Sequence, residues 1–266
     1  MIRASHISVQ LPSKTKILDD VSFDIKPGVL TVILGKNGAG KSTALKALCG
    51  DIPHATGHTF IDEKDQSLVP IDVLAQKRAV VSQKTTLDFG FTVREVVAIG
   101  RAPFTGIFHS KKDEEIIADC LIKVDALHLI DRDYPTLSGG EQQRVQFARA
   151  LAQLWNSIEA KTPSYLLLDE PLASLDVAHQ HEMMLILQQI CAHNVGVLIV
   201  LHDLNLAAQY SDHVLILKHG RIVAEGSPVQ VFTDEIISQA FDHPVNVIPH
   251  PRIDCPLIIA ANRHIS

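Results

Sequence analysis

The chain has 266 residues, of which 46% are hydrophobic, and carries a formal net charge of −6. This length accommodates one large α/β domain or a core with an inserted subdomain, and the apolar content is ample for a buried core. The acidic balance argues against broad nucleic-acid binding, so no nucleic-acid partner is expected.

The cysteines and the apolar runs indicate the redox compartment of the protein and whether it spans a membrane. Its four cysteines are scattered and never form a C-x-x-C pair, which favours a reduced, intracellular protein without a zinc ribbon. No apolar run approaches the ~18 residues that a membrane helix needs. The first residues also lack the apolar stretch of a signal peptide. A membrane role would therefore act through a partner.

In chain order, the pattern predicts strands and helices that alternate after a strand-rich start. The predicted strands are Ile7–Val9, Val21–Ile25, Thr56–Ile61, Ala79–Gln83, Tyr165–Asp169, Val197–Leu201, His213–Leu217 and Arg221–Glu225. The predicted helices are Ala44–Cys49, a helix that opens at Thr92 and runs through Ile99, Lys111–Val124, and Val177–Cys191. The apolar strands on either side of the last helix indicate a βαβ unit in a buried parallel sheet.

A glycine-rich stretch lies between an apolar strand and a helix-forming run, and consists of Gly35, Lys36, Asn37, Gly38, Ala39, Gly40, Lys41, Ser42 and Thr43. Glycines allow the backbone N–H groups to wrap a phosphate, and the following helix points its positive end at it. Lys41 can reach the β- and γ-phosphates, and Ser42 can offer its hydroxyl to Mg²⁺. The stretch predicts a nucleoside triphosphate site with magnesium.

A second motif opens a later amphipathic helix with Leu137, Ser138, Gly139, Gly140 and Glu141. Ser138 and Glu141 fit a capping box, which an ordinary helix start would explain. The glycine pair at a helix N-terminus also makes a second anion site, which a protein with one nucleotide site would not need.

The two motifs together resemble the ATP-binding-cassette (ABC) ATPases, whose signature is Leu-Ser-Gly-Gly-Gln/Glu. The resemblance covers nearly the whole chain. It implies a P-loop α/β core with an antiparallel β portion and an inserted helical subdomain. It also implies a homodimer in which the signature of one subunit closes over the ATP held by the phosphate loop of the other.

The apolar run Tyr165–Leu168 ends in two acids, Asp169 and Glu170. A carboxylate at a strand tip can hold magnesium through water, and a second can orient or deprotonate the attacking water. Asp169 suits the first role and Glu170 the second. An Asp-Glu pair at a strand end is commonly only a solvated turn, but its place after the phosphate loop and signature favours the catalytic reading.

The resemblance assigns roles to further residues. It places Gln83 at the metal and the attacking water, and His202 at the γ-phosphate. Ser174, Leu175 and Asp176 match the loop that crosses the dimer interface, although they could also cap the helix from Val177.

Two stretches depart from the family pattern. Many ABC ATPases stack an aromatic residue on adenine near the end of the first strand, but residues 10–13, Gln-Leu-Pro-Ser, contain none, which leaves only Leu11 for apolar contact. The stretch Ala152–Pro163 is longer than usual.

We expect one ABC domain over residues 1–266, with residues 1–84 and 152–266 as the nucleotide-binding core and 85–151 as the helical signature subdomain. A transporter subunit is favoured over a soluble ABC ATPase of DNA repair or ribosomes, because the chain has one cassette and no sustained heptads. A P-loop kinase or GTPase would leave the signature and His202 without a purpose.

Four stretches are similar to the importers of iron chelates, haem and cobalamin: Phe91–Val97, Gly100–Pro103, His202–Ala208 and Tyr210–Asp212. The extended Ala152–Pro163 segment and the tail Phe241–Pro244 are most similar to the haemin importers. This resemblance implies two permease copies at the cytoplasmic face of the bacterial inner membrane, fed by a periplasmic haem-binding protein. Ferric-siderophore or cobalamin import is the alternative. The resemblance to these importers also implies that residues 85–88 help to form a groove that receives a permease helix.

Direct haem ligation by the ATPase itself is not expected. His179 and His181 lie two positions apart, so they face different ways on a helix and cannot share a ligand.

Overall fold

The computed structural model describes residues 1–10, 15–52, 56–83, 90–105 and 110–261. Expectations for the adenine contact at residues 11–13 and for the permease groove at residues 85–88 therefore lie outside the described residues. The chain forms two compact units, Met1–Leu68 with Leu198–Ser266, and Val69–Val197. Within the described ranges, no helix has both the length and the apolar character to cross a membrane.

The first unit begins with an antiparallel sheet in the strand order β2-β1-β4-β5. Its strands are β1 (Ile2–Gln10), β2 (Lys16–Ile25), β4 (Thr56–Ile61) and β5 (Lys64–Asp65). The short helix η1 (Gln66–Leu68) follows β5. Strand β1 is longer than the predicted Ile7–Val9. A register shift between Ala4 and Ile7, where His6 has a φ of 53°, interrupts the alternation of apolar and polar residues that the prediction relied on.

A second group of strands in this unit carries the phosphate loop. Strand β3 (Leu30–Leu34) is buried at every position and pairs in parallel with β9 (His213–Lys218). Strand β10 (Arg221–Gly226) pairs antiparallel with β9, so the predicted hairpin is confirmed. Helix α1 (Lys41–Cys49) follows β3 and buries Leu45 and Leu48. Strand, loop and helix thus form one continuous unit, as the sequence predicts.

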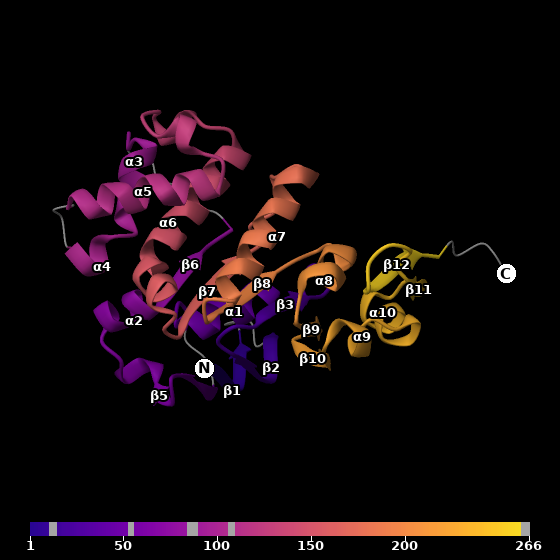
Figure 1. Cartoon of the computed structure of the whole chain (residues 1–266). Helices are drawn as coiled ribbons and strands as arrows, with labels where there is room; N and C mark the ends of the chain where they lie inside the picture. Colours follow the sequence, from indigo (N-terminus) through magenta and orange to yellow (C-terminus); the bar gives the residue numbers. More distant parts are fainter. Residues whose placement is uncertain (11–14, 53–55, 84–89, 106–109, 262–266) are drawn as a thin grey trace. The chain divides into compact units, whose positions relative to one another are not determined.

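The first unit ends in a series of short elements that the sequence pattern did not predict (Figure 1). Helix α8 (Leu204–Tyr210) is followed, after β9 and β10, by α9 (Pro228–Val231), α10 (Asp234–Phe241), β11 (Val245–Pro249) and β12 (Pro256–Ala260). Strands β11 and β12 form an antiparallel pair. We call residues 227–261 the C-terminal module.

The second unit combines a parallel strand pair with helices (Figure 1). Strands β6 (Arg78–Val81) and β7 (Ser164–Asp169) are parallel, and all six residues of β7 are buried. The helices are α2 (Ile71–Lys77), α3 (Val93–Ile99), α4 (Ala102–Thr105), α5 (Lys111–Lys123), η2 (Leu127–Leu129), η3 (Tyr134–Thr136), α6 (Gly139–Ala160) and α7 (Val177–Cys191). Strand β8 (Val195–Val200) carries the chain back into the first unit.

Capping explains where three of these helices begin. Thr92, Ser110 and Ser138 each accept a hydrogen bond from the backbone three residues on, and an acidic side chain there returns the bond. Each capping box satisfies two backbone donors that would otherwise lack partners. The predicted capping boxes at Thr92 and Ser138 are confirmed.

Candidate active site

The phosphate loop of the first unit requires glycine at its tightest points. Gly35 has a φ of 151° and a side chain there would lie 2.3 Å from the carbonyl oxygen of Leu217. Gly40, just before α1, has a φ of 104°, and a Cβ atom there would lie 2.9 Å from the carbonyl oxygen of Ile17. Any other residue would displace backbone at both points. The loop is therefore closely packed from behind.

Lys41 opens α1 and folds back into the loop. Its Nζ donates to the carbonyl oxygens of Gly35 at 2.9 Å and of Lys36 at 3.2 Å. The residue is only 5% exposed, and a buried ammonium requires such partners. Phosphate oxygens are stronger acceptors than carbonyls for a lysine. The loop thus holds a cation at the place where the sequence predicts the β- and γ-phosphates.

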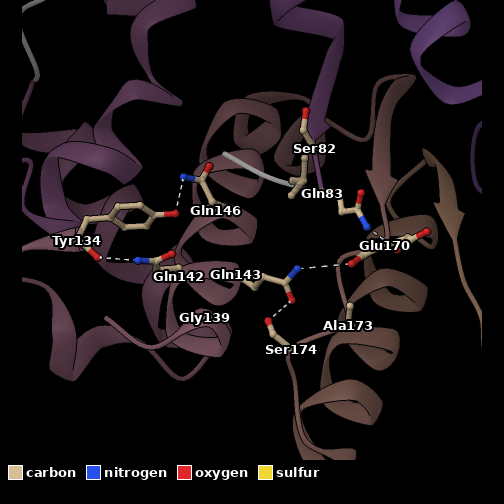
Figure 2. A pocket seen from close by; sticks show the side chains of 11 residues that line it. Ser82, Gln83, Tyr134, Gly139, Gln142, Gln143, Gln146, Glu170, Ala173 and Ser174 are labelled. Carbon is tan, nitrogen blue, oxygen red and sulfur yellow. Dashed lines mark hydrogen bonds between the residues drawn. The ribbon is translucent and has the colours of Figure 1, made fainter. Parts of the chain in front are cut away.

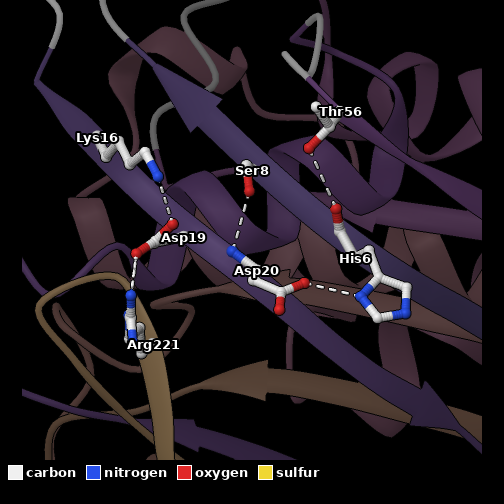
Figure 3. Close-up of polar contacts among 7 residues, drawn as sticks. All are labelled: His6, Ser8, Lys16, Asp19, Asp20, Thr56 and Arg221. Carbon is white, nitrogen blue, oxygen red and sulfur yellow. Dashed lines mark hydrogen bonds and ion pairs between the residues drawn. The ribbon is translucent and has the colours of Figure 1, made fainter.

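The loop is also tied to the β9–β10 hairpin and to β2. The carbonyl of Ala39 accepts from the N–H of Gly220 at 3.0 Å, and the carbonyl of Gly220 accepts from Asp19 at 2.9 Å. Asp19 in turn receives hydrogen bonds from Lys16 at 2.7 Å and Arg221 at 2.9 Å (Figure 3). These hydrogen bonds from Lys16 and Arg221 lower the pKa of the Asp19 carboxyl. The phosphate loop therefore rests on a connected backbone support.

In the second unit, the tip of β7 carries both predicted acids. Asp169 is 2% exposed, whereas Glu170 is half-buried and has a left-handed backbone, φ 51°. Gln83, which follows β6, donates from Nε2 to Oε2 of Glu170 at 2.7 Å (Figure 2). The structure therefore brings two of the predicted catalytic side chains into contact.

The predicted signature and the predicted dimer loop lie side by side in this unit. A side chain at Gly140 would lie 3.1 Å from the carbonyl oxygen of Ser174. The Ser174 hydroxyl donates to Gln143 of α6 at 2.8 Å, and Gln143 donates to the carbonyl oxygen of Glu170 at 3.5 Å. Gln143, which the sequence analysis did not single out, thus connects the signature helix to the end of β7.

Gln83, Glu170 and Ser174 line one cleft of about 340 Å³ (Figure 2). Its lining residues are Val81, Ser82, Gln83, Tyr134, Gly139, Gln142, Gln143, Gln146, Glu170, Ala173 and Ser174. Four of them are glutamines, and their amides supply both donors and acceptors to the cleft. Gln83 donates to the Glu170 carboxylate, whereas Gln142 and Gln146 donate to Tyr134. The sequence did not predict that the glutamines of α6 line a cleft, because polar residues on a helix ordinarily indicate its solvent face.

The remaining predicted residues lie at the ends of helices and strands. Ser138 is the N-cap of α6, and its hydrogen bonds to Glu141 lower the pKa of that carboxyl. Asp176 caps α7, which confirms the capping alternative for that residue. His202, in the first unit, is exposed directly before α8.

Magnesium fits the donor chemistry of the predicted ligands. Ser42, Asp169 and Gln83 offer a hydroxyl, a carboxylate and an amide oxygen, and hard divalent cations prefer such oxygen ligands. Asp169 is a buried carboxylate at a strand tip, and a bound cation is one means of stabilising such a charge.

The fold and these motifs define an ATP-binding cassette. A family model described as ABC transporter matches residues 18–173. The chain therefore belongs to the ABC transporter family, and its α/β fold with an antiparallel β portion is that of a P-loop ABC ATPase.

Curated relatives extend over almost the entire chain. The hemin import ATP-binding protein HmuV of Hahella chejuensis is 42% identical and aligns with 97% of this chain and 99% of its own. The protein of the same name from Pseudomonas fluorescens is 44% identical over 98% and 100% of the two chains.

Solved structures agree on the fold. A transporter assigned to the metal-chelate type of ABC transporter, in an inward-facing conformation, superposes with a TM-score of 0.80 at 23% identity and covers 98% of both chains. A dimeric bacterial ABC transporter cassette gives a TM-score of 0.76 at 25% identity and covers 85% of this chain and 98% of its own.

Proposed function

We propose that this protein is the ATP-hydrolysing subunit of a bacterial ABC importer whose cargo is haem. The hydrolytic role depends on one observation above the others, the Gln83–Glu170 hydrogen bond at the tip of the buried strand β7. A carboxylate held in a defined orientation by a neighbouring amide is suited to align an attacking water. The phosphate loop and Lys41 supply the complementary part, a cation and backbone donors for a triphosphate.

Each predicted residue has a distinct task in this proposal. Residues 35–43 and Lys41 bind the triphosphate, and Ser42, Asp169 and Gln83 hold Mg²⁺. The magnesium ion neutralises charge on the phosphates when it is bound. Glu170 accepts a hydrogen bond from the attacking water, which orients it, and then takes up its proton. His202 contacts the γ-phosphate. Positioning and charge neutralisation supply most of the catalysis in phosphoryl transfer.

We further propose that two copies of the chain act as a head-to-tail homodimer. Leu137–Glu141 of one subunit would close over the ATP of the other, and Ser174–Asp176 would cross the interface. The exposed position of Ser138 and Gly139 supports this arrangement, because both would be accessible to a partner. ATP binding would favour the closed dimer and hydrolysis would reopen it. Residues 85–151 would act as the signature subdomain within one ABC domain.

The dimer would attach to two permease subunits at the cytoplasmic face of the inner membrane, with a periplasmic haem-binding protein delivering cargo. The names of the near full-length relatives support haem as the cargo. A ferric siderophore or cobalamin is the second candidate, supported by the fold of the metal-chelate type transporter.

The test is ATPase activity of the chain assembled with its cognate permease in lipid. Binding proteins loaded with haem or with a ferric siderophore would be compared as stimulants, with the unloaded proteins as controls. Stimulation by the haem-loaded protein alone is expected. Stimulation by the siderophore-loaded protein instead would change the assigned cargo to a ferric siderophore and would still support the importer function. Failure to assemble with any permease would favour a soluble ABC ATPase.

A further inference from the structure

The C-terminal module contacts the phosphate loop through the carboxylate of Asp242. Asp242 follows α10 as its C-cap, and its Oδ2 accepts from Nζ of Lys36 at 3.1 Å. Its Oδ1 accepts from Nζ of Lys218 at 2.7 Å. Lys218 also donates to the carbonyl oxygen of Gln239, in the last turn of α10. One carboxylate therefore joins the module to the β9 strand and to the second residue of the phosphate loop.

Local backbone structure keeps Asp242 in place. Its φ of 53° is left-handed, as is common for a residue that ends a helix. After it, the N–H groups of His243 and Val245 donate to the carbonyl and the hydroxyl of Ser238 at 3.2 and 3.0 Å. The carboxylate is therefore presented from a closed turn, and not from the tip of a mobile tail.

Lys36 occupies a position from which this contact can affect phosphate binding. Its carbonyl oxygen accepts from Nζ of Lys41 at 3.2 Å and from the N–H of Ala39 at 3.1 Å. The same residue therefore holds Asp242 with its side chain and shapes the loop with its backbone. A restraint on Lys36 reduces the number of conformations that the loop must give up when a triphosphate binds.

A second contact joins the module to the segment that carries His202. Asn205 of α8 donates to the carbonyl oxygen of Ile258 at 3.2 Å and accepts from the N–H of Ile258 at 2.7 Å. Helix α8 begins with its cap, Asp203, directly after His202. The module is thus hydrogen-bonded both to the phosphate loop, at Lys36, and to the helix that follows His202, at Asn205.

We propose that the C-terminal module pre-organises the nucleotide site, and that Asp242 is a positioning residue that acts on the phosphate loop through Lys36. This inference depends on the proposed ATPase function. Hydrogen bonds from Lys218 and then from Lys36 lower the pKa of Asp242 to about 2. The carboxylate therefore stays ionised at neutral pH.

An ordinary surface ion pair is the competing explanation. The side chains of Lys36 and Asp242 are 50% and 52% exposed, and such pairs often contribute little. The two explanations differ in the quantity they affect. A surface pair would leave nucleotide affinity unchanged, whereas a positioning contact would change affinity and KM without changing kcat.

The experiment measures Mg-ATP affinity of the full chain with a fluorescent ATP analogue, together with steady-state ATPase kinetics. Asp242→Asn is expected to raise Kd and KM about 3- to 10-fold while kcat stays within about twofold, because only loop order is lost. Asp242→Glu, which keeps the charge, should recover most of the affinity. Asp24→Asn is the matched control, since Asp24 forms an exposed pair with Arg3 at 3.2 Å in the same unit.

A double-mutant cycle with Lys36→Met identifies the route of the effect. If Asp242 acts through Lys36, Asp242→Asn should change Kd less than about 1.5-fold in the Lys36→Met background. An equal effect in both backgrounds would mean a general charge effect and would overturn the inference, as would an unchanged Kd in Asp242→Asn itself. Failure of the wild-type chain to bind Mg-ATP would instead refute the proposed function.

Discussion

Glu170 combines a left-handed backbone with a fixed side chain. Its φ of 51° is uncommon for a residue with a Cβ atom, and such conformations cluster at functional sites. The Gln83 hydrogen bond of 2.7 Å then fixes the carboxylate. The backbone of this residue is also held, because its carbonyl oxygen accepts from Gln143 at 3.5 Å. Backbone and side chain together orient this one acid.

Substitution of Glu170 by glutamine tests the catalytic assignment. The amide preserves the size of the side chain but cannot accept a proton from water, so hydrolysis should fall by about 10²- to 10⁴-fold. Mg-ATP binding should persist, and a nucleotide-bound dimer should accumulate. Single-turnover phosphate release and size-exclusion chromatography measure the two effects. Glu159→Gln, on the exposed end of α6, is the control. Normal turnover in Glu170→Gln would remove this residue from its role.

Substitution of Lys41 by alanine tests the phosphate loop. The loop would lose its buried cation, and the carbonyls of Gly35 and Lys36 would lose a donor. Mg-ATP affinity should drop at least about tenfold, since charge-assisted hydrogen bonds to phosphate are among the strongest. Equilibrium titration with a fluorescent ATP analogue measures it. Lys46→Ala provides the control, because Lys46 is an exposed residue of the same helix. Equal affinities of Lys41→Ala and wild type would contradict the assignment.

At the scale of elements, a buried ion pair joins Arg101, which directly precedes α4, to α5 and α6. Arg101 donates to Asp113 at 2.8 Å, to the carbonyl of Ala152 at 2.7 Å and to Asn156 at 3.0 Å. Asp113 also completes the capping box of α5. The stretch Ala152–Pro163, whose length was unexplained from the sequence, begins as the continuation of α6 to Ala160. Its first turns provide two of the acceptors for Arg101.

Because of the Arg101–Asp113 pair, the free energy of unfolding should decrease as the pH falls in the acid range. Burial opposes ionisation of Asp113, but hydrogen bonds from Arg101 and Ser110 outweigh it and lower the pKa from 3.8 to about 2. A depressed carboxyl pKa contributes stability that is fully present above pH 3.8 and is lost as the pH falls through about 2. The contribution is about 2 kcal/mol. Urea unfolding of wild type and Asp113→Asn should differ by this amount at pH 5.

The difference between the two proteins should shrink steadily between pH 4 and pH 2. A constant difference over this range would mean that Asp113 does not titrate with the expected pKa. Asp131→Asn is the control variant, because its carboxylate contacts Arg94 at 3.1 Å but is 82% exposed. That variant should follow the wild-type stability curve.

The sequence was most informative where a structure depends on neighbouring residues. The capping box at Ser138, the phosphate loop and the acidic end of β7 all follow from short motifs with a local physical cause. The Lys36–Asp242 contact joins residues that are 206 positions apart, and no local pattern indicates it. The cleft glutamines were missed for a related reason, because polarity alone does not distinguish a solvent face from a site.

At the scale of the whole molecule, the motifs divide between two compact units. The first unit carries Lys41 and His202, and the second carries Glu170, the signature and residues 174–176. A head-to-tail dimer would complete each ATP site with a signature from the other copy. This arrangement predicts that a copy with a defective phosphate loop and a copy with a defective signature can together form one working ATP site.

Two variants separate the halves of such a composite site. Lys41→Ala disables the phosphate loop, and Gly139→Asp places a negative charge in the signature. Among the described residues, a Cβ atom at Gly139 would lie in ordinary contact with Ser174, 3.6 Å from its Cβ atom, and an acidic residue suits the first turn of a helix. The Gly139→Asp chain should therefore fold, while its new charge repels the γ-phosphate of a partner's ATP. Each variant alone should give an inactive homodimer.

Complexes that contain one copy of each variant should regain activity. One of their two sites has an intact phosphate loop and faces an intact signature, so about half of the wild-type rate is expected if the sites are independent. Differently tagged variants, co-expressed with the permease and purified through both tags, provide this complex. If each site instead used the loop and signature of one chain, both copies would be defective and the doubly tagged complex would stay inactive. The rate of that complex therefore decides between a shared and a self-contained site.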